Sequence, residues 1–253
     1  MTRLIAGEFH KLATTRLWLG LLLAALAITA LYTSLDIAFA DHPGTWTYPL
    51  STVEGQRALL AIGAGVAPLV AVLGAIGLTG EYRHRTATAT FLATPHRGQV
   101  VAAKLVTYAL AGVGYALAGT ALVAAIAVPW LAAKHIHLSL GAGAIAATLA
   151  GVIAAVAIWG LLGVGLAALL RDQIVTVVGL LIYLFIVERI LTSIPAMNTW
   201  TRYLPGQAQE ALTGTTLTTQ SLLNPWQGGV LLAAYGIALA VAGTLLAIRR
   251  DIT

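Results

Sequence analysis

The sequence predicts an all-α integral membrane protein with six transmembrane helices, and three observations support this prediction. Of the 253 residues, 59% are hydrophobic and only 9% are charged, whereas a soluble domain carries about 25% charged residues. Six apolar segments are long enough to cross a bilayer, which takes about 20 residues. The 14 Lys and Arg residues flank these segments, so the net charge of +5 indicates membrane topology and not nucleic-acid binding. The absence of cysteine also excludes a disulfide scaffold.

Residues 1–16 predict a short helix that lies in the membrane interface. Ile5, Phe9 and Leu12 fall on one helical face, while Arg3 and His10 fall on the other. This pattern is typical of an interfacial amphipathic helix, and the alternative is a disordered polar leader. No small-residue cleavage site follows the next apolar run, so we expect a retained span and not a signal peptide.

Six spans follow, and the third and fourth are longer than a simple crossing, which predicts tilt or extension beyond the bilayer. Pro68 and Pro129 predict kinks or breaks in the second and third spans. The predicted spans are residues 17–35, 58–79, 100–131, 139–170, 174–194 and 228–248. The fourth span carries small residues at four-residue intervals, a pattern that favours helix packing within the chain over a dimer interface. These residues are Gly143, Ala147, Gly151 and Ala155.

An even number of spans places both termini on one side, and the charges choose that side. With both termini inside, the inner segments hold ten of the 14 Lys and Arg residues and the outer segments hold the other four. Because basic residues accumulate on the cytoplasmic side, both termini are predicted to be cytoplasmic. Residues 195–227 then form an outer segment, predicted to be an interfacial or re-entrant cap with aromatic anchors at Trp200, Tyr203 and Trp226.

Residues 80–99, between the second and third spans, form a loop of about twenty residues where a few would suffice. The middle of this loop has no helix breaker before Pro95, so we expect a short cytoplasmic helix bounded by a proline turn. His84 and His96 have no companion ligands at a workable spacing, and the sequence therefore predicts no metal site there.

The N-terminal helix and this loop together resemble the ABC-2 type transporter permeases. The helix carries an E-x-x-K-L-x-x-T-R pattern at Glu8, Lys11, Leu12, Thr15 and Arg16. The loop is similar to a longer run of the family, matched at Glu81, Thr86, Phe91, Leu92, Thr94, Pro95, Arg97 and Lys104. The chain departs from that run at Arg85, where the family often has glycine, and Arg97 stands one place early.

The resemblance implies a type V exporter-like fold in which residues 80–99 hold a coupling helix that docks on a separate ATPase subunit. The residues expected to couple to the ATPase are Glu81, Tyr82, Arg83, His84, Arg85, Thr86, Phe91, Leu92, Thr94, Pro95 and Arg97. Those expected to matter in the interfacial helix are Glu8, Phe9, Lys11, Leu12 and Arg16. The resemblance also implies two permeases, as a homodimer, with two ATPases in a bacterial plasma membrane.

The sequence has no G-x-x-x-x-G-K-[ST] phosphate loop, so ATP hydrolysis is expected on a separate chain. This chain is expected to be a transporter membrane subunit and not an enzyme. No cofactor is expected on the chain, and ATP and Mg²⁺ are expected on the partner ATPase. The predicted function is export of a hydrophobic or amphipathic substrate such as a drug, antibiotic, lipid or peptide. Sparse polar groups in the spans are candidates for the substrate path: Thr33, Thr107, Tyr108, Tyr115, Thr176 and Tyr183.

Three other functions remain as alternatives: a secondary transporter, a non-transport membrane subunit and an intramembrane enzyme. A secondary transporter usually places ionisable residues near the middle of its spans, and the predicted spans carry none there. An intramembrane enzyme needs paired catalytic groups or a metal cluster within the spans, whereas all six histidines fall in loops or at span ends.

Glu188 and Arg189 are adjacent charges within the fifth apolar run and are candidates for an outer gate. Neighbouring helix positions point about 100° apart, so the two charges do not neutralise each other across one face. In the gate hypothesis, Glu188 faces the outer end of the path or pairs with Arg57 or Arg202 and helps to hold an external gate shut. In the alternative, the fifth helix ends at Val187 and both charges are solvated. The sequence leaves both hypotheses open.

Overall fold

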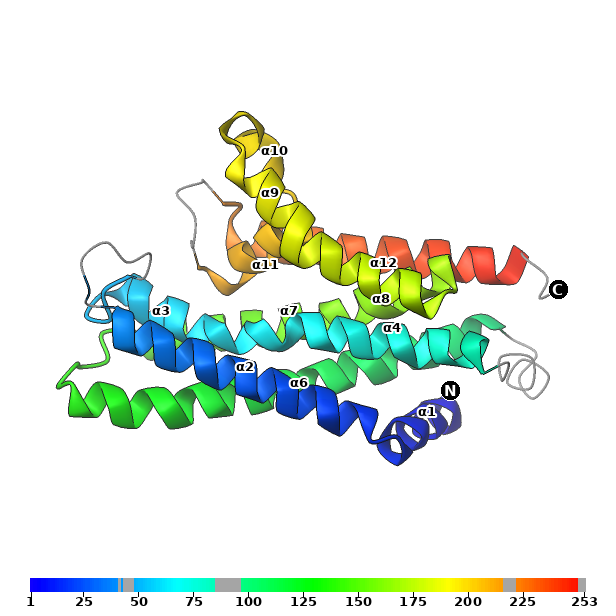
Figure 1. The fold of residues 1–253 in the computed structure, drawn as a ribbon, viewed down its shortest axis with the longest axis horizontal. Helices are drawn as coiled ribbons and strands as arrows, with labels where there is room; N and C mark the ends of the chain where they lie inside the picture. The colour runs from blue at the N-terminus through cyan, green and yellow to red at the C-terminus, as the bar shows by residue number, and fades with distance from the viewer. Residues whose placement is uncertain (41, 43–47, 85–96, 216–221, 250–253) are drawn as a thin grey trace.

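The computed structural model describes the chain except for residues 41, 43–47, 85–96, 216–221 and 250–253, and the described part contains helices and no strand (Figure 1). Six of its helices are long and apolar enough to cross a membrane, which confirms the predicted number of spans. These helices are Leu17–Phe39, Val53–Arg83, Gly98–Ala133, Ala142–Leu170, Gln173–Ser193 and Pro225–Leu245.

Two of the spans are composite, since a 3-10 turn interrupts the second and a π turn interrupts the fifth. In chain order the elements are α1 (Thr2–Thr14), α2 (Leu17–Phe39), α3 (Val53–Ala61), η1 (Ile62–Val66), α4 (Ala67–Arg83), α6 (Arg97–Ala133), α7 (Ala142–Leu170), α8 (Gln173–Ile182), η2 (Tyr183–Val187), α9 (Glu188–Ser193), η3 (Pro195–Met197), α10 (Asn198–Thr201), α11 (Pro205–Thr213) and α12 (Pro225–Arg249). The N-terminal helix predicted from the sequence is therefore present as α1.

The two prolines predicted to disturb spans behave differently. Pro68 stands in the first turn of α4, directly after the 3-10 turn η1, so the second span is interrupted there. Pro129 lies inside α6, and the helix continues past it to Ala133. A proline this close to a helix end removes one backbone hydrogen bond but leaves few turns for the kink to displace.

The centre of the bundle is built by α4, α6 and α7, whose backbones touch through glycines. A Cβ added at Gly74 would lie 2.6 Å from the carbonyl oxygen of Gly160, and one at Gly112 would lie 2.8 Å from that of Val156. Only part of the small-residue stripe predicted on the fourth span makes such close contacts. Gly151 lies against Leu212 of α11, whereas Gly143 meets nothing within 4 Å.

The bundle has two distinct ends. At one, here named the terminal end, lie α1 with the N-terminus, the end of α4, the start of α6 and the end of α12 (Figure 1). At the other, here named the cap end, lie α3 and α11 (Figure 1). Gln56 of α3, only 2% exposed, stabilises the cap end: it donates to the carbonyls of Leu50 and His137 and accepts from the amides of Ser139 and Leu140.

The candidate path residues are mostly turned into the packing of this chain. Thr33, Thr107 and Thr176 are fully buried, and each hydroxyl donates to the carbonyl four residues earlier. Tyr115 donates to the carbonyl of Trp18, and Tyr108 is 5% exposed. These side chains therefore stabilise helices and helix contacts within one chain and do not line an open path through it.

Candidate functional site

Four charged side chains from three elements meet at the terminal end and form what we name the ion tetrad: Glu8 and Lys11 of α1, Glu81 of α4 and Lys104 of α6. The Lys104 ammonium lies 2.5 Å from Glu8 Oε2 and 2.9 Å from Glu81 Oε1. The Lys11 ammonium lies 2.7 Å from Glu8 Oε1 and 2.9 Å from Glu81 Oε1. Each lysine therefore bridges both carboxylates, and α1 is joined to two spans.

Local sequence explains why these groups can converge. Glu8 and Lys11 are three residues apart on α1, a spacing that places them on the same face. Glu81 stands in the last turn of α4. Lys104 stands about two turns inside α6, at 3.6 residues per turn. An ion so far inside an apolar helix needs a partner from another element, and the end of α4 provides one.

The tetrad is buried most deeply around Lys104, whose side chain is 1% exposed. An ammonium has three protons to donate, and all three of its hydrogen bonds are made, because Lys104 also reaches the carbonyl of Gly77 at 3.2 Å. The charges sum to zero, which is the condition under which buried ions are tolerated. Lys11 is the half-exposed member, with 52% of its side chain accessible.

The neighbouring carboxylates of the tetrad shift the pKa of Lys11. Burial lowers the pKa of its ammonium, but hydrogen bonds and charge attraction from Glu8 and Glu81 outweigh burial and raise the pKa above its ordinary value. Lys11 therefore stays charged throughout the neutral range.

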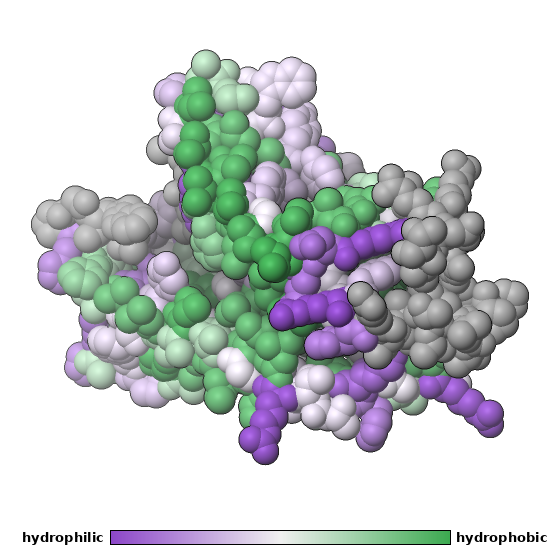
Figure 2. Space-filling model, turned by 45° about the vertical axis from the view of Figure 1, so that its right-hand side comes forward, coloured by the Kyte–Doolittle hydropathy of each residue, from purple (hydrophilic) through white to green (hydrophobic). Residues whose placement is uncertain are grey.

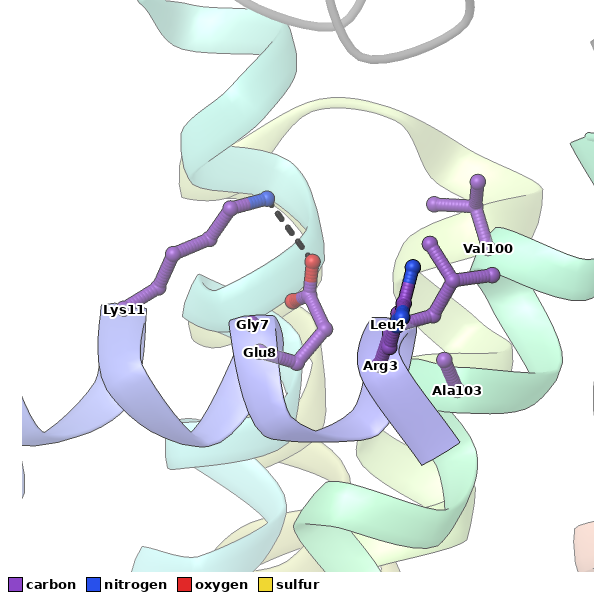
Figure 3. A pocket seen from close by; sticks show the side chains of 7 residues that line it. All are labelled: Arg3, Leu4, Gly7, Glu8, Lys11, Val100 and Ala103. Atoms are coloured by element: carbon purple, nitrogen blue, oxygen red, sulfur yellow. Dashed lines mark hydrogen bonds and ion pairs between the residues drawn. The ribbon is translucent and has the colours of Figure 1, made fainter. Parts of the chain in front are cut away.

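A shallow pocket borders the tetrad where α1 crosses the start of α6 (Figure 3). Figure 3 shows Glu8 and Lys11 pointing toward each other from consecutive turns of α1, with Val100 and Ala103 of α6 opposite. The pocket measures about 150 Å³, which is below the roughly 300–1,000 Å³ of small-molecule sites. We therefore interpret the tetrad as a joint between helices and not as a ligand site.

The other residues singled out at this end fall into three groups. Tyr82 packs under Arg171, whose guanidinium carbon lies 5.9 Å from the ring centroid, and Arg83 and His84 are exposed. Arg97 begins α6. Phe9 and Leu12 are half-buried and Arg16 is exposed. Six predicted coupling residues lie outside the described part of the chain: Arg85, Thr86, Phe91, Leu92, Thr94 and Pro95.

At the cap end, Glu188 accepts a hydrogen bond from the backbone amide of Gln207 at 3.1 Å and is 5% exposed. The hypothesis that the fifth helix ends at Val187 is wrong, because the helix continues through the π turn η2 into α9. The structure also pairs Glu188 with neither predicted arginine. Arg57 approaches the carbonyl of Gly214 at 3.5 Å, and Arg202 donates to the Tyr203 hydroxyl.

The reason for this difference is the position of α11. Glu188 lies at its N-terminus and Arg57 at its C-terminus, roughly 10 Å apart along the helix at about 1.5 Å per residue. Each charge has the sign that the helix macrodipole favours at its end. Arg189, beside Glu188, is exposed.

No protein-family model matches the chain, and no curated protein matches its sequence. The fold and composition by themselves define an all-helical, multi-pass membrane protein.

Proposed function

We propose that this chain is the membrane-spanning subunit of an ATP-binding-cassette exporter of the ABC-2 type. Two copies assemble with two separate ATPase subunits and move a hydrophobic or amphipathic substrate such as a drug, antibiotic, lipid or peptide. The chain hydrolyses no ATP itself.

The observation that carries the proposal is the convergence of Glu8, Lys11, Glu81 and Lys104. These residues come from the two segments that resemble the permease family, and nothing in their sequence separation requires them to touch. Their contacts join the interfacial helix to the end of α4, where residues 80–99, the loop in which the coupling helix is expected, begin. A force applied to that loop would therefore reach α1, α4 and α6 together.

The arrangement of the spans supports a path between two copies of the chain. The second and fourth spans are well buried, whereas the other four bury only 17–28% of their most apolar stretch. Figure 2 shows a continuous hydrophobic strip along the arm formed by the fifth span, which exposes Ile174, Phe185 and Ile190. These surfaces suit contact with lipid, with a second copy and with an apolar substrate.

The proposal places both termini in the cytoplasm of a bacterial cell, with the chain in its plasma membrane. Hydrophilic side chains gather at the terminal end (Figure 2), as expected of a face that lies outside the hydrocarbon core. Because the chain has no cysteine, single cysteines report sidedness cleanly. In intact cells, a cysteine at Ser51 should react with a membrane-impermeant maleimide, and one at Thr14 should react only after permeabilisation. Labelling of Thr14 but not of Ser51 from outside would reverse the orientation.

The function itself is tested by purifying the tagged full chain from the membranes of the cell that encodes it. We expect an ATPase subunit to co-purify in equal amount, with Mg²⁺-dependent ATP hydrolysis in the eluate. Everted membrane vesicles should accumulate a substrate only when ATP is added. Uptake driven by a proton or sodium gradient without ATP would favour a secondary transporter and contradict the proposal.

A further inference from the structure

Three buried side-chain oxygens at the cap end have no hydrogen-bond partner in the described part of the chain: Glu188 Oε2, Gln207 Oε1 and Glu210 Oε2. Glu188 and Gln207 are 5% and 3% exposed. Such groups normally find a partner, since a buried acceptor without one has lost its hydrogen bonds to water and gained none in return. The three acceptors therefore indicate a place that lacks a donor.

The carboxylates of Glu188 and Glu210 lie along one face of α11. The carboxylate of Glu188 occupies the space beside Gly206, where an added Cβ would lie 2.5 Å from Oε1. Glu210 follows Gly206 by four residues and so stands one turn further along the same face. Negative charges on both carboxylates would repel each other.

The surrounding elements supply little compensating charge. Arg189 of α9 attracts both carboxylates, yet it is exposed and makes no ion pair with either in the described structure. Tyr183 of η2 interacts electrostatically with Glu188, and Tyr235 of α12 donates to the carbonyl of Tyr203. Arg202 bonds Tyr203, Arg57 lies at the far end of α11, and α7 contributes no titratable group to this contact.

We propose that Glu188 and Glu210 form a two-carboxylate site at the cap end that holds one exchangeable proton while α11 is docked on the fifth helix. One proton halves the negative charge and converts one orphaned acceptor into a donor.

The two residues have different roles in this site. Glu188 accepts a hydrogen bond from the amide of Gln207 in the first turn of α11. Glu210 has no such donor, and burial, reinforced by the charge of Glu188 against the attraction of Arg189, raises the pKa of its carboxyl to about 7. Glu210 therefore carries the proton near neutral pH, and Glu188 caps α11.

The pH dependence has a definite sign. The pKa of Glu210 is higher in the folded chain than its ordinary value of 4.5, so the protonated form stabilises the fold. This contribution is complete below about pH 4.5 and is lost as the pH rises through about 7. The site therefore loosens in alkaline medium and tightens in mildly acidic medium.

The test measures the thermal midpoint of the purified full-length protein in lipid nanodiscs between about pH 5.5 and pH 8.5. We expect the midpoint of the parent to fall across this range and that of Glu210→Gln, which mimics the protonated acid, to stay level. Glu188→Gln should move the fall to lower pH, because it removes the neighbouring charge. Glu54→Gln, an exposed acid of α3, is the control and should keep the parent profile.

An infrared measurement follows the proton directly. The band of a protonated carboxyl should be present in the parent at about pH 6, absent at about pH 8.5, and missing from Glu210→Gln. A Glu210→Gln profile identical to the parent's would overturn the proposal. Restoration of the parent midpoint at high pH by Na⁺, K⁺ or Ca²⁺, but not of the Glu210→Gln midpoint, would overturn it in favour of a metal cation. Neither measurement depends on transport, so the proposed function stands or falls separately.

Discussion

Replacing Lys104 with Met is expected to lower the free energy of unfolding by about 3–5 kcal/mol, the largest stability effect among single substitutions at the terminal end. Met keeps the volume of the side chain but removes the ammonium that bridges Glu8 and Glu81. Two carboxylates would then remain close together with only the half-exposed Lys11 as counterion. Thermal unfolding of the purified protein measures the loss. The reactivity of a single cysteine at Ile5 should rise as α1 detaches.

The matched control is Lys11→Met. It removes the other cation of the ion tetrad, but 52% of this side chain is exposed, so the expected cost is only about 0–1 kcal/mol. Adding Glu8→Gln to Lys104→Met should recover part of the stability, because it removes the one carboxylate charge that Lys11 does not balance. Equal destabilisation by Lys104→Met and Lys11→Met would show that the tetrad is not organised around Lys104.

Replacing Phe91 with Asp is expected to abolish export while the protein still inserts and accumulates. The loop between α4 and α6 is the proposed contact with the ATPase, and an aromatic anchor at an interface contributes about 2–4 kcal/mol, or roughly 30- to 1,000-fold in affinity. Export from vesicles and the amount of co-purified ATPase measure the effect. Ser51→Asp places the same charge at the cap end and should leave both unchanged.

A comparison of Phe91→Asp with Glu81→Gln separates docking from transmission. Glu81→Gln removes the carboxylate that contacts both lysines, so it should lower stability as well as export while the ATPase still binds. If Phe91→Asp exports at the parental rate, the loop is a solvated basic connector that obeys the positive-inside rule, and the coupling proposal is contradicted.

The spans could be predicted because hydropathy depends on composition over about 20 residues and needs no tertiary information. The residues at which the spans begin and end were harder to predict. The second span begins with α3 at Val53 and not near residue 58. Thr52 caps this helix, because its hydroxyl accepts a hydrogen bond from the amide of Gly55 at 3.0 Å. The sequence does contain a helix-start signal there, a threonine followed by an acidic first turn. Because these residues are polar, a search for apolar segments does not include them in a span.

The residues of the ion tetrad could be found from the sequence, but the contacts between them could not. Glu8, Lys11, Glu81 and Lys104 all match permease motifs, but they were assigned to the interfacial helix or to the coupling loop and not to one another as partners. Lys104 was also counted as a topological charge, although its position inside an apolar helix already required a counterion. The partner of Glu188 could not be inferred, because it is the backbone of α11, and the π turn before it has no sequence signature.

The glycine contacts of α4 and α7 restrict where this protein can change shape. Where Gly163 faces the carbonyl of Ala71 and Gly74 faces that of Gly160, two backbones touch with no side chain that could change rotamer. Packed backbones of this kind have one arrangement and do not slide in small steps. Gly165 of α7 lies equally close to Leu239 of α12. Together α4, α7 and α12 therefore act as a fixed frame, and any opening toward either side of the membrane has to come from hinge motion of the less buried α2 and fifth span around it.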